Sequence, residues 1–460
     1  MFRNRITDPV FQDKYLRRFW PVLLIAVSAV PLQAQVTYAE DLFPELTDLM
    51  YLAADEGPEA QLVELGVEEK EGDLDVARSQ RRPRINMYAR LLAAYEWRED
   101  IDDRLRGRIN ANLSMTQPLY YWGNLKRREE VAEDRLAAQK LDARNRGLQS
   151  IMRLRRSYLE WLLVRERREI LRQSISLSDS YVDARRQLVD AGRSSEQDVL
   201  EMEARLLEKS EALARTEKRS IELAAILRQL VGPSLDLNHL QGASLSDIEP
   251  MSEDAFRELE SRVRGQSGEY LNLDQERWEL LVSVEEKNIE TLDKNTWPSV
   301  DFVAGFYSDQ IDGINQADPV FRVQAFAGLQ MNWNIFDGWQ NDGWKRGAMA
   351  RKRGFELQAD MADEDARRQA ETLLAELQLN LKQIEARGKR ESILSRRLEL
   401  LNNQMDLATV TGADLIEAEI DYLQARQGLM EARVDYLMNL MELGALLGLD
   451  PALPPYASES

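Results

Sequence analysis

The sequence predicts a mixed α and β membrane protein with a duplicated unit, a β-hairpin followed by very long coiled-coil helices. Two stretches without proline, residues 119–232 and 320–450, carry apolar residues at the 4-3 spacing of a coiled-coil seam. Shorter stretches at or just before their starts alternate between apolar and polar residues, which is typical of strands. A shift of 216 residues aligns the two halves, for example Asp198 with Asp414. An internal repeat of this length indicates duplication of one structural unit.

The composition of the 460-residue chain excludes several kinds of chemistry. The chain has no cysteine, which rules out disulfides, thiolate zinc sites and cysteine nucleophiles, and its single histidine is His239. The formal charge of −20 argues against a nucleic-acid-binding protein. A mean hydropathy of −0.47 excludes a protein with many transmembrane helices. Since no serine, threonine or lysine has a recognisable base beside it, we expect no enzyme, no cofactor and no bound metal.

Residues 1–34 are predicted to be a signal peptide. Three basic residues precede an apolar run at 19–30, and the small residue Ala34 follows it. This run is too short for a membrane-spanning helix, which needs about 20 residues. Cleavage is expected after Ala34, with Ala39 as a second candidate. The alternative is a buried N-terminal helix, which the polar character of the remaining chain disfavours.

The first structural repeat is predicted at 35–232. Its elements are a helix at 40–82, strands at 85–97 and 108–121, and long helices at 124–190 and 195–231. The first helix should end before Pro83, because the residue before a proline avoids the helical conformation. A helix over 124–190 would be about 100 Å long at a rise of about 1.5 Å per residue, which implies a coiled-coil rod.

The second structural repeat is predicted at 253–450 with the same order of elements. It has a helix at 253–296, strands at 300–308 and 321–336, and long helices at 340–408 and 412–447. An inter-repeat linker at 233–252 and a C-terminal tail at 451–460 complete the chain.

Two architectures explain the alternation within the strands. A small soluble sheet with one face on a core would alternate between apolar and polar residues. So would a transmembrane barrel with apolar side chains toward lipid and polar ones toward a wet lumen. Aromatic residues favour the barrel because they gather near the strand ends, as membrane-interface aromatics do; they are Trp97, Tyr120, Tyr121, Trp122, Trp297, Trp333, Phe336 and Trp339.

Four strands cannot close into a barrel, and an unpaired strand edge cannot face lipid. The sequence therefore predicts that several chains share one transmembrane barrel. Three chains would give twelve strands.

These features together resemble the TolC-like outer-membrane efflux protein family, the outer-membrane factors of tripartite export systems. The resemblance covers nearly the whole mature chain. It is carried by the proline before each hairpin and by the segments that flank the long helices, namely Pro83, Pro298, 117–120, 334–338, 192–203 and 412–419. It implies a homotrimer that shares one twelve-stranded barrel and a periplasmic α-helical tunnel. It also implies an equatorial belt, to which the linker and the tail would contribute.

The resemblance also implies a channel constriction, or gate, at the turns between the long helices. Asp414 and Glu417 match carboxylates that ring the constriction in the family, and the repeat relates them to Asp198 and Glu201. Three-fold symmetry would turn Asp414 and Glu417 into rings of about six carboxylates that attract cations and repel anions. The alternative is that acids at a helix start complement the helix dipole.

The second turn departs from the family. Ala408 stands where a glycine is usual, and Val410 stands where a gating arginine is expected. The resemblance therefore carries over the position of the gate, but not its closed-state contacts.

The expected function is a passive exit duct for small molecules in the bacterial outer membrane, with most of the chain in the periplasm. Its expected partners are a periplasmic adaptor protein, an inner-membrane pump and membrane lipid. One alternative is a type I protein-secretion duct of the same family. Another is a periplasmic coiled-coil adaptor or scaffold, which would need a biotin-carrier-like domain or a membrane anchor that the sequence lacks. The sequence does not distinguish whether the exported substrate is a drug, a metal ion or a polypeptide.

Overall fold

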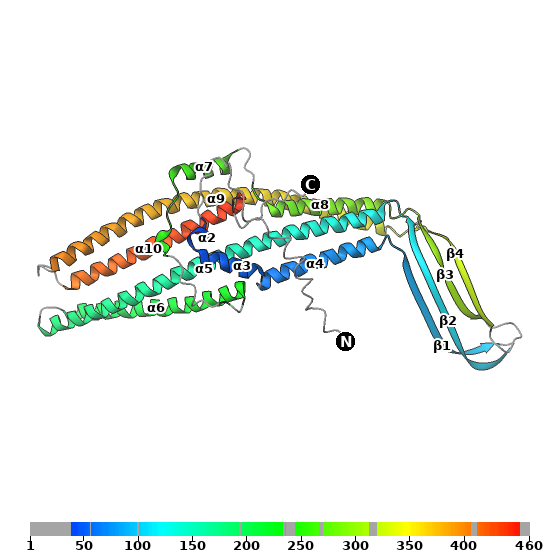
Figure 1. Cartoon of the computed structure of the whole chain (residues 1–460), viewed down its shortest axis with the longest axis horizontal. Helices are drawn as coiled ribbons and strands as arrows, with labels where there is room; N and C mark the ends of the chain where they lie inside the picture. Colours follow the sequence, from blue (N-terminus) through cyan, green and yellow to red (C-terminus); the bar gives the residue numbers. More distant parts are fainter. Residues whose placement is uncertain are drawn as a thin grey trace.

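The computed structural model of the chain describes residues 38–55, 57–98, 101–192, 195–232, 235, 244–265, 270–311, 320–405 and 412–450. The molecule is elongated, with a small antiparallel sheet at one end and long helices along the rest (Figure 1). The predicted signal peptide and C-terminal tail lie outside the described residues, as does His239. No helix within the described ranges is both long and apolar enough to cross a bilayer.

Four strands form one antiparallel sheet in the order β1-β2-β3-β4. Their bounds are β1 Arg84–Arg98, β2 Ile101–Tyr120, β3 Ser299–Ile311 and β4 Val320–Asn332. β1 with β2 and β3 with β4 form the two hairpins, and β2 also pairs with β3. The two repeats therefore share one sheet, whose edges are β1 and β4.

Two strand boundaries differ from the prediction by four residues or more. β2 begins at Ile101 instead of residue 108, because its pairing with β1 continues as far as Ile101 opposite Arg98. β4 ends at Asn332 instead of residue 336, where its partner strand β3 begins at Ser299. Since Pro298 precedes β3 and has no N–H to donate, the pairing does not continue past this point.

The long helices form two hairpins: α5 (Asn124–Asp190) with α6 (Glu196–Val231), and α9 (Gln340–Met405) with α10 (Gly412–Leu446). α5 spans the same residues as the predicted helix at 124–190. α6 begins one residue later than expected because Ser195 is its N-cap, with the Ser195 hydroxyl accepting a hydrogen bond from the Gln197 N–H at 3.2 Å. α10 packs on both α9 and α5, so the order across the rod is α9, α10, α5, α6 (Figure 1).

The predicted helix at 40–82 is divided into α2 (Ala39–Leu42), α3 (Pro44–Asp55) and α4 (Pro58–Ser79). Each of the last two begins with a proline, which fits the first turn of a helix but not its interior. Gly57, before α4, lies so close to the backbone that a Cβ there would come within 2.1 Å of the Ala53 carbonyl oxygen.

The predicted helix at 253–296 is divided in the same way, into α7 (Glu253–Arg264) and α8 (Leu273–Asp293). Gly265 takes an extended conformation after α7. The Asn272 side chain then caps α8 by accepting a hydrogen bond from the Gln275 N–H at 3.0 Å. In the half of the rod next to the sheet, α8 lies between α9 and α5, and α4 packs on the other side of α5 (Figure 1).

The main hydrophobic core lies midway along the rod, where α2, α3 and the short 3-10 helix η2 (Leu245–Asp247) pack on the long helices (Figure 1). Phe43 packs edge-on against Tyr158, and the Tyr436 hydroxyl accepts a hydrogen bond from the Met251 N–H at 2.9 Å. Tyr38 and Ala39 are also buried there. Their burial favours signal cleavage after Ala34, since cleavage after Ala39 would remove two core residues.

A buried ionic cluster joins both ends of the described chain to the middle of α5. The Arg155 guanidinium, fully buried, donates hydrogen bonds to Asp450 Oδ1 at 2.9 Å and to Glu40 Oε1 at 2.6 Å. Burial by itself lowers the pKa of Arg155, but the hydrogen bonds to these two carboxylates raise it above its ordinary value. Arg155 therefore stays charged and holds the N-terminal segment against the end of α10.

Removing this cation is expected to destabilise the fold strongly. Arg155→Met removes the buried cation that Asp450 and Glu40 share, and breaking a buried pair in this way costs about 3–5 kcal/mol. Heating the detergent-solubilised protein while following its helical circular dichroism should therefore give a markedly lower melting temperature.

The matched control is Arg156→Ala, one residue along α5. The Arg156 side chain is 60% exposed and pairs with Glu442, so its loss should cost at most about 1 kcal/mol. Equal melting temperatures for the two variants would contradict a structural role for the buried cluster.

Candidate membrane sheet and channel gate

The register of the sheet places most of the large apolar residues of the four strands on one face. Met87 pairs with Leu113, and Leu113 pairs with Phe306. The same alignment continues along the strands, with Ile85 opposite Met115, Leu91 opposite Ile109, Phe302 opposite Leu329 and Val300 opposite Met331. Side chains of this face are exposed in the single chain: the exposed fraction is 76% for Leu91 and 72% for Leu329. A soluble monomer rarely exposes such a continuous apolar surface.

The opposite face of the sheet is mainly polar. Asn86 pairs with Ser114, Asn112 with Tyr307, and Tyr307 with Gln324. The buried carboxylate of Asp301 lies on this face and accepts hydrogen bonds from Tyr121 Oη at 2.9 Å and Asn332 Nδ2 at 3.3 Å. One apolar and one polar face is the arrangement of a barrel wall between lipid and a wet lumen.

The predicted interface aromatics lie at both ends of the sheet. Trp97 contacts Tyr95 near the end of β1 that is remote from the helices, with ring centroids 5.0 Å apart. The strand between Ile85 and Trp97 is about 40 Å long, which at a tilt of about 45° spans about 28 Å of bilayer. This matches the height of about 25 Å that an outward apolar band has in outer-membrane barrels.

The other aromatics gather where the sheet joins the helices. The Trp122 ring lies 4.8 Å from that of Tyr120 and 4.6 Å from that of Trp297. In the second repeat Phe336 and Trp339 contact each other at 6.1 Å, and the Trp333 indole donates to the Thr296 carbonyl at 3.0 Å. Tyr121 instead directs its hydroxyl to the polar face, as described above.

The second strand of each hairpin is connected to the following long helix by a segment that contains two consecutive residues with positive φ. They are Trp122 and Gly123 in the first repeat (54° and 81°) and Gly338 and Trp339 in the second (both 68°). Among the described residues these tryptophans are the only non-glycine residues with positive φ. Such a conformation is costly for a bulky side chain. The hydrogen bond of 2.8 Å from the Trp122 indole to the Pro298 carbonyl helps to hold the first turn.

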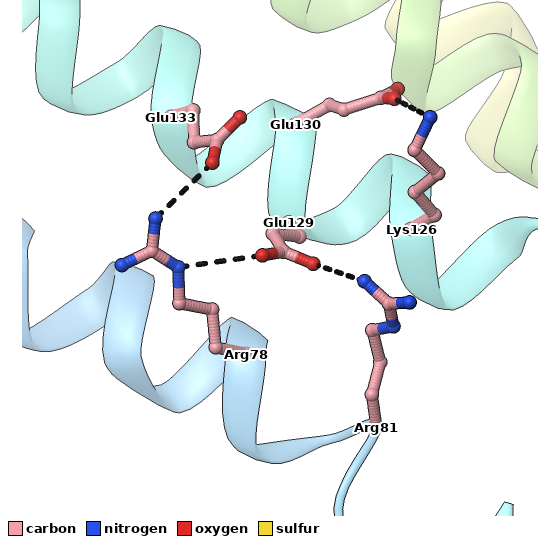
Figure 2. A network of polar contacts seen from close by, with 6 residues as sticks. All are labelled: Arg78, Arg81, Lys126, Glu129, Glu130 and Glu133. Carbon is pink, nitrogen blue, oxygen red and sulfur yellow. Dashed lines mark hydrogen bonds and ion pairs between the residues drawn. The ribbon is translucent and has the colours of Figure 1, made fainter.

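A network of ion pairs fixes the same junction on the side of α4, as Figure 2 shows. Arg81 donates to Glu129 at 2.8 Å, and Arg78 reaches both Glu129 at 3.4 Å and Glu133 at 3.3 Å. The hydrogen bond from Arg81 lowers the pKa of the Glu129 carboxyl. A single ion pair on the surface contributes little to stability. Here two arginines at the end of α4 share one carboxylate of α5, and together they fix the position at which α4 ends and the chain continues into β1.

The sequence pattern does not reveal this network, because its partners are about 50 residues apart. A signal was nevertheless present. Glu129 and Glu133 are four residues apart and therefore share one helix face, and Arg78 and Arg81 come just before Pro83.

The predicted gate residues lie at the end of the rod that is remote from the sheet, where both helical hairpins turn (Figure 1). Asp414 and Glu417 are in the first turns of α10, both exposed and three residues apart, so they share one face. Asp198 lies in the first turn of α6. Glu201 follows it and pairs with Arg205 at 2.9 Å. Ala408 and Val410 lie outside the described residues.

The structure does not bring the four gate acids of one chain together. Among the described residues, α10 packs on α9 and α5, whereas α6 packs on α5. One ion pair that the sequence pattern does not reveal joins the two helices of each hairpin near its turn: Arg186 with Glu203 at 2.5 Å, and Arg397 with Asp421 at 3.3 Å. Any carboxylate ring must therefore be completed by other copies of the chain.

A sheet with one apolar face, joined at aromatic-rich turns to a rod of paired helices, is the arrangement that a barrel channel with a helical tunnel requires of each chain. Residues 49–233 match the sequence profile of the outer membrane efflux protein family. The matched segment spans most of the first structural repeat, so the chain resembles this family over that repeat. No relative was found among curated protein sequences.

Solved structures with the same fold include three outer-membrane channels. CusC has a TM-score of 0.69 at 16% identity, covering 93% of this chain and 98% of its own. CmeC of Campylobacter jejuni has a TM-score of 0.70 at 12% identity, covering 92% and 90%. The open state of MtrE of Neisseria gonorrhoeae has a TM-score of 0.68 at 16% identity, covering 92% and 94%. The predicted fold class is confirmed: one β-sheet joined to very long coiled-coil helices.

Proposed function

We propose that three copies of this chain form the exit duct of a tripartite export system for small molecules. The observation that carries the proposal is the four-stranded sheet with a continuous apolar face and two open edges, β1 and β4. An unpaired edge in hydrocarbon leaves backbone groups without partners at several kcal/mol each. Pairing β1 of one copy with β4 of the next removes both edges, and three copies close a barrel of twelve strands.

The duct supplies no energy itself. As in the family, an inner-membrane pump and a periplasmic adaptor protein would load it from the periplasmic end. Asp414 and Glu417 would ring the constriction there, with Asp198 and Glu201 on the neighbouring hairpins. Their charge favours cations over anions at the entrance. An iris-like shift of the α9–α10 hairpin would widen this entrance when the adaptor docks.

Deletion of the chain tests the export function. We expect a lower inhibitory concentration for at least one toxic compound in a broad panel, restored by the wild-type chain. Unchanged susceptibility together with loss of a secreted polypeptide would contradict small-molecule efflux and support the type I secretion alternative. A chain that fractionates with soluble periplasmic proteins would support the adaptor alternative.

A further inference from the structure

The rod has two lateral edges, α6 and α9, and each of these helices packs on the neighbouring long helix through one face only. The seam of α6 with α5 keeps the 4-3 spacing throughout. Its members are buried or half-buried: Val199, Met202, Leu206, Lys209, Leu213, Thr216, Ser220, Leu223, Leu227 and Leu230. In α9 the corresponding seam with α10 includes Leu373, Leu377, Asn380, Ile384, Leu394, Leu398 and Leu401.

α6 carries a second apolar row that no other described residue of the chain covers. Leu200, Leu207, Ala214 and Ile221 follow one another at intervals of seven residues. The three large side chains are 59%, 71% and 72% exposed, and Ala214 is exposed as well. Each member directly follows a residue of the first seam, so the row lies on a different face of the helix.

α9 carries a row of the same kind. Leu379, Ala386, Ile393 and Leu400 also recur every seven residues. The three large side chains are 53%, 66% and 54% exposed, and Ala386 is exposed. Polar helix faces on the outside of a rod have no reason to repeat leucine or isoleucine at heptad spacing, so the row indicates a second helix partner.

The two rows match when the helices run antiparallel. Leu200 lies in the second turn of α6, close to the tip of its hairpin, and Leu400 lies in the second-last turn of α9, close to the tip of the other. Both tips are at the same end of the molecule (Figure 1). From this end the successive layers are Leu200 with Leu400, Leu207 with Ile393, Ala214 with Ala386, and Ile221 with Leu379. Large residues meet large ones, and alanine meets alanine.

Charges agree with the same alignment around the alanine layer. It places Glu211 opposite Lys389 and Arg215 opposite Glu385. Within each helix these residues already form pairs of opposite charge, Glu211 with Arg215 and Glu385 with Lys389. The alignment therefore makes a quartet of alternating charges. Lys218 falls opposite Lys382, a repulsion that Glu222, 3.7 Å from Lys218 Nζ, partly offsets.

We propose that α6 of one copy and α9 of the next form an antiparallel coiled-coil seam in this register. The inference rests on the proposed trimer, in which three such seams would close the lower tunnel. It adds which helices meet and which residues face each other. It also has a consequence for the gate: α10, which carries Asp414 and Glu417, lies outside the seam and is held only by its own chain.

Disulfide formation tests the register, because the chain contains no cysteine of its own. A disulfide requires Cβ atoms about 3.8 Å apart. We expect Ala214→Cys with Ala386→Cys to give covalent dimers and trimers of the full chain after mild oxidation in outer membranes, and each single variant to give none. The matched control, Ala214→Cys with Ile393→Cys, is displaced by one heptad, about 10 Å along the helix, and should not cross-link.

A native mass measurement on the same samples separates the inference from the proposed function. Three chains per particle with cross-linking of the displaced pair, or of neither pair, would overturn the seam and leave the trimeric duct intact. One chain per particle would overturn both.

Discussion

Ile109→Arg is expected to remove most of the assembled protein from the outer membrane. Ile109 lies on the apolar face of β2 opposite Leu91, midway between the levels of Ile85 and Trp97. An arginine that faces lipid near the middle of the bilayer costs about 2–4 kcal/mol, and a shared barrel would contain it once per copy. The measurement is the amount of heat-modifiable oligomer in outer-membrane extracts relative to wild type.

Asn112→Arg is the matched control, because it introduces the same side chain three residues further along the same strand. Asn112 lies on the polar face, opposite Tyr88 and Tyr307. We expect near-normal assembly, since an arginine in a wet lumen stays hydrated. Equal loss for both variants, or equal tolerance of both, would contradict the assignment of the two faces.

Asp414→Asn combined with Glu417→Gln is expected to shift ion selectivity in planar bilayers. One unit charge at about 4 Å in water attracts a cation and repels an anion by about 1 kcal/mol each, so losing rings of about six carboxylates should reduce the cation-to-anion permeability ratio at least about tenfold. Single-channel reversal potentials in a salt gradient measure this ratio.

Glu253→Gln with Asp254→Asn provides the control for that experiment. These acids start α7, away from the hairpin turns, and their side chains are 89% and 96% exposed. Selectivity should not change. If the Asp414 and Glu417 variant also keeps wild-type selectivity but melts at a lower temperature, the two acids serve the helix dipole instead of the channel.

Much of the fold could be predicted because its signals are local. The 4-3 spacing and the absence of proline define α5 over the same residues in sequence and structure. Alternation in 109–115 and 321–335 predicts which side chains share a face, and the register of the sheet aligns the two alternations. Both signals need only the period of the element itself.

The rest depends on contacts between distant residues or on local exceptions. The predicted helix at 40–82 is interrupted before Pro44 and before Pro58. These interruptions were not predicted, because the apolar residues on both sides keep a helical spacing. The cluster of Arg155 and Asp450 joins positions 295 residues apart. Positive φ at Trp122 could not be expected from its residue type, since this conformation is rare for bulky side chains.

The gate stays a prediction. The repeat places Asp198 and Asp414 in the first turns of two helices, but a ring of carboxylates is a property of an assembly, and a single chain holds these acids on helices that do not pack together. The ties near the turns, Arg186 with Glu203 and Arg397 with Asp421, depend on how the two helices of each hairpin wind around each other.

Imaging of single particles purified from outer membranes tests most directly whether the β-hairpins of several chains form one closed barrel. The account predicts a three-fold symmetric tube about 140 Å long, the sum of the rod and a barrel of bilayer thickness, with three chains per particle. A particle containing one chain, with its sheet folded against its own helices, would contradict it.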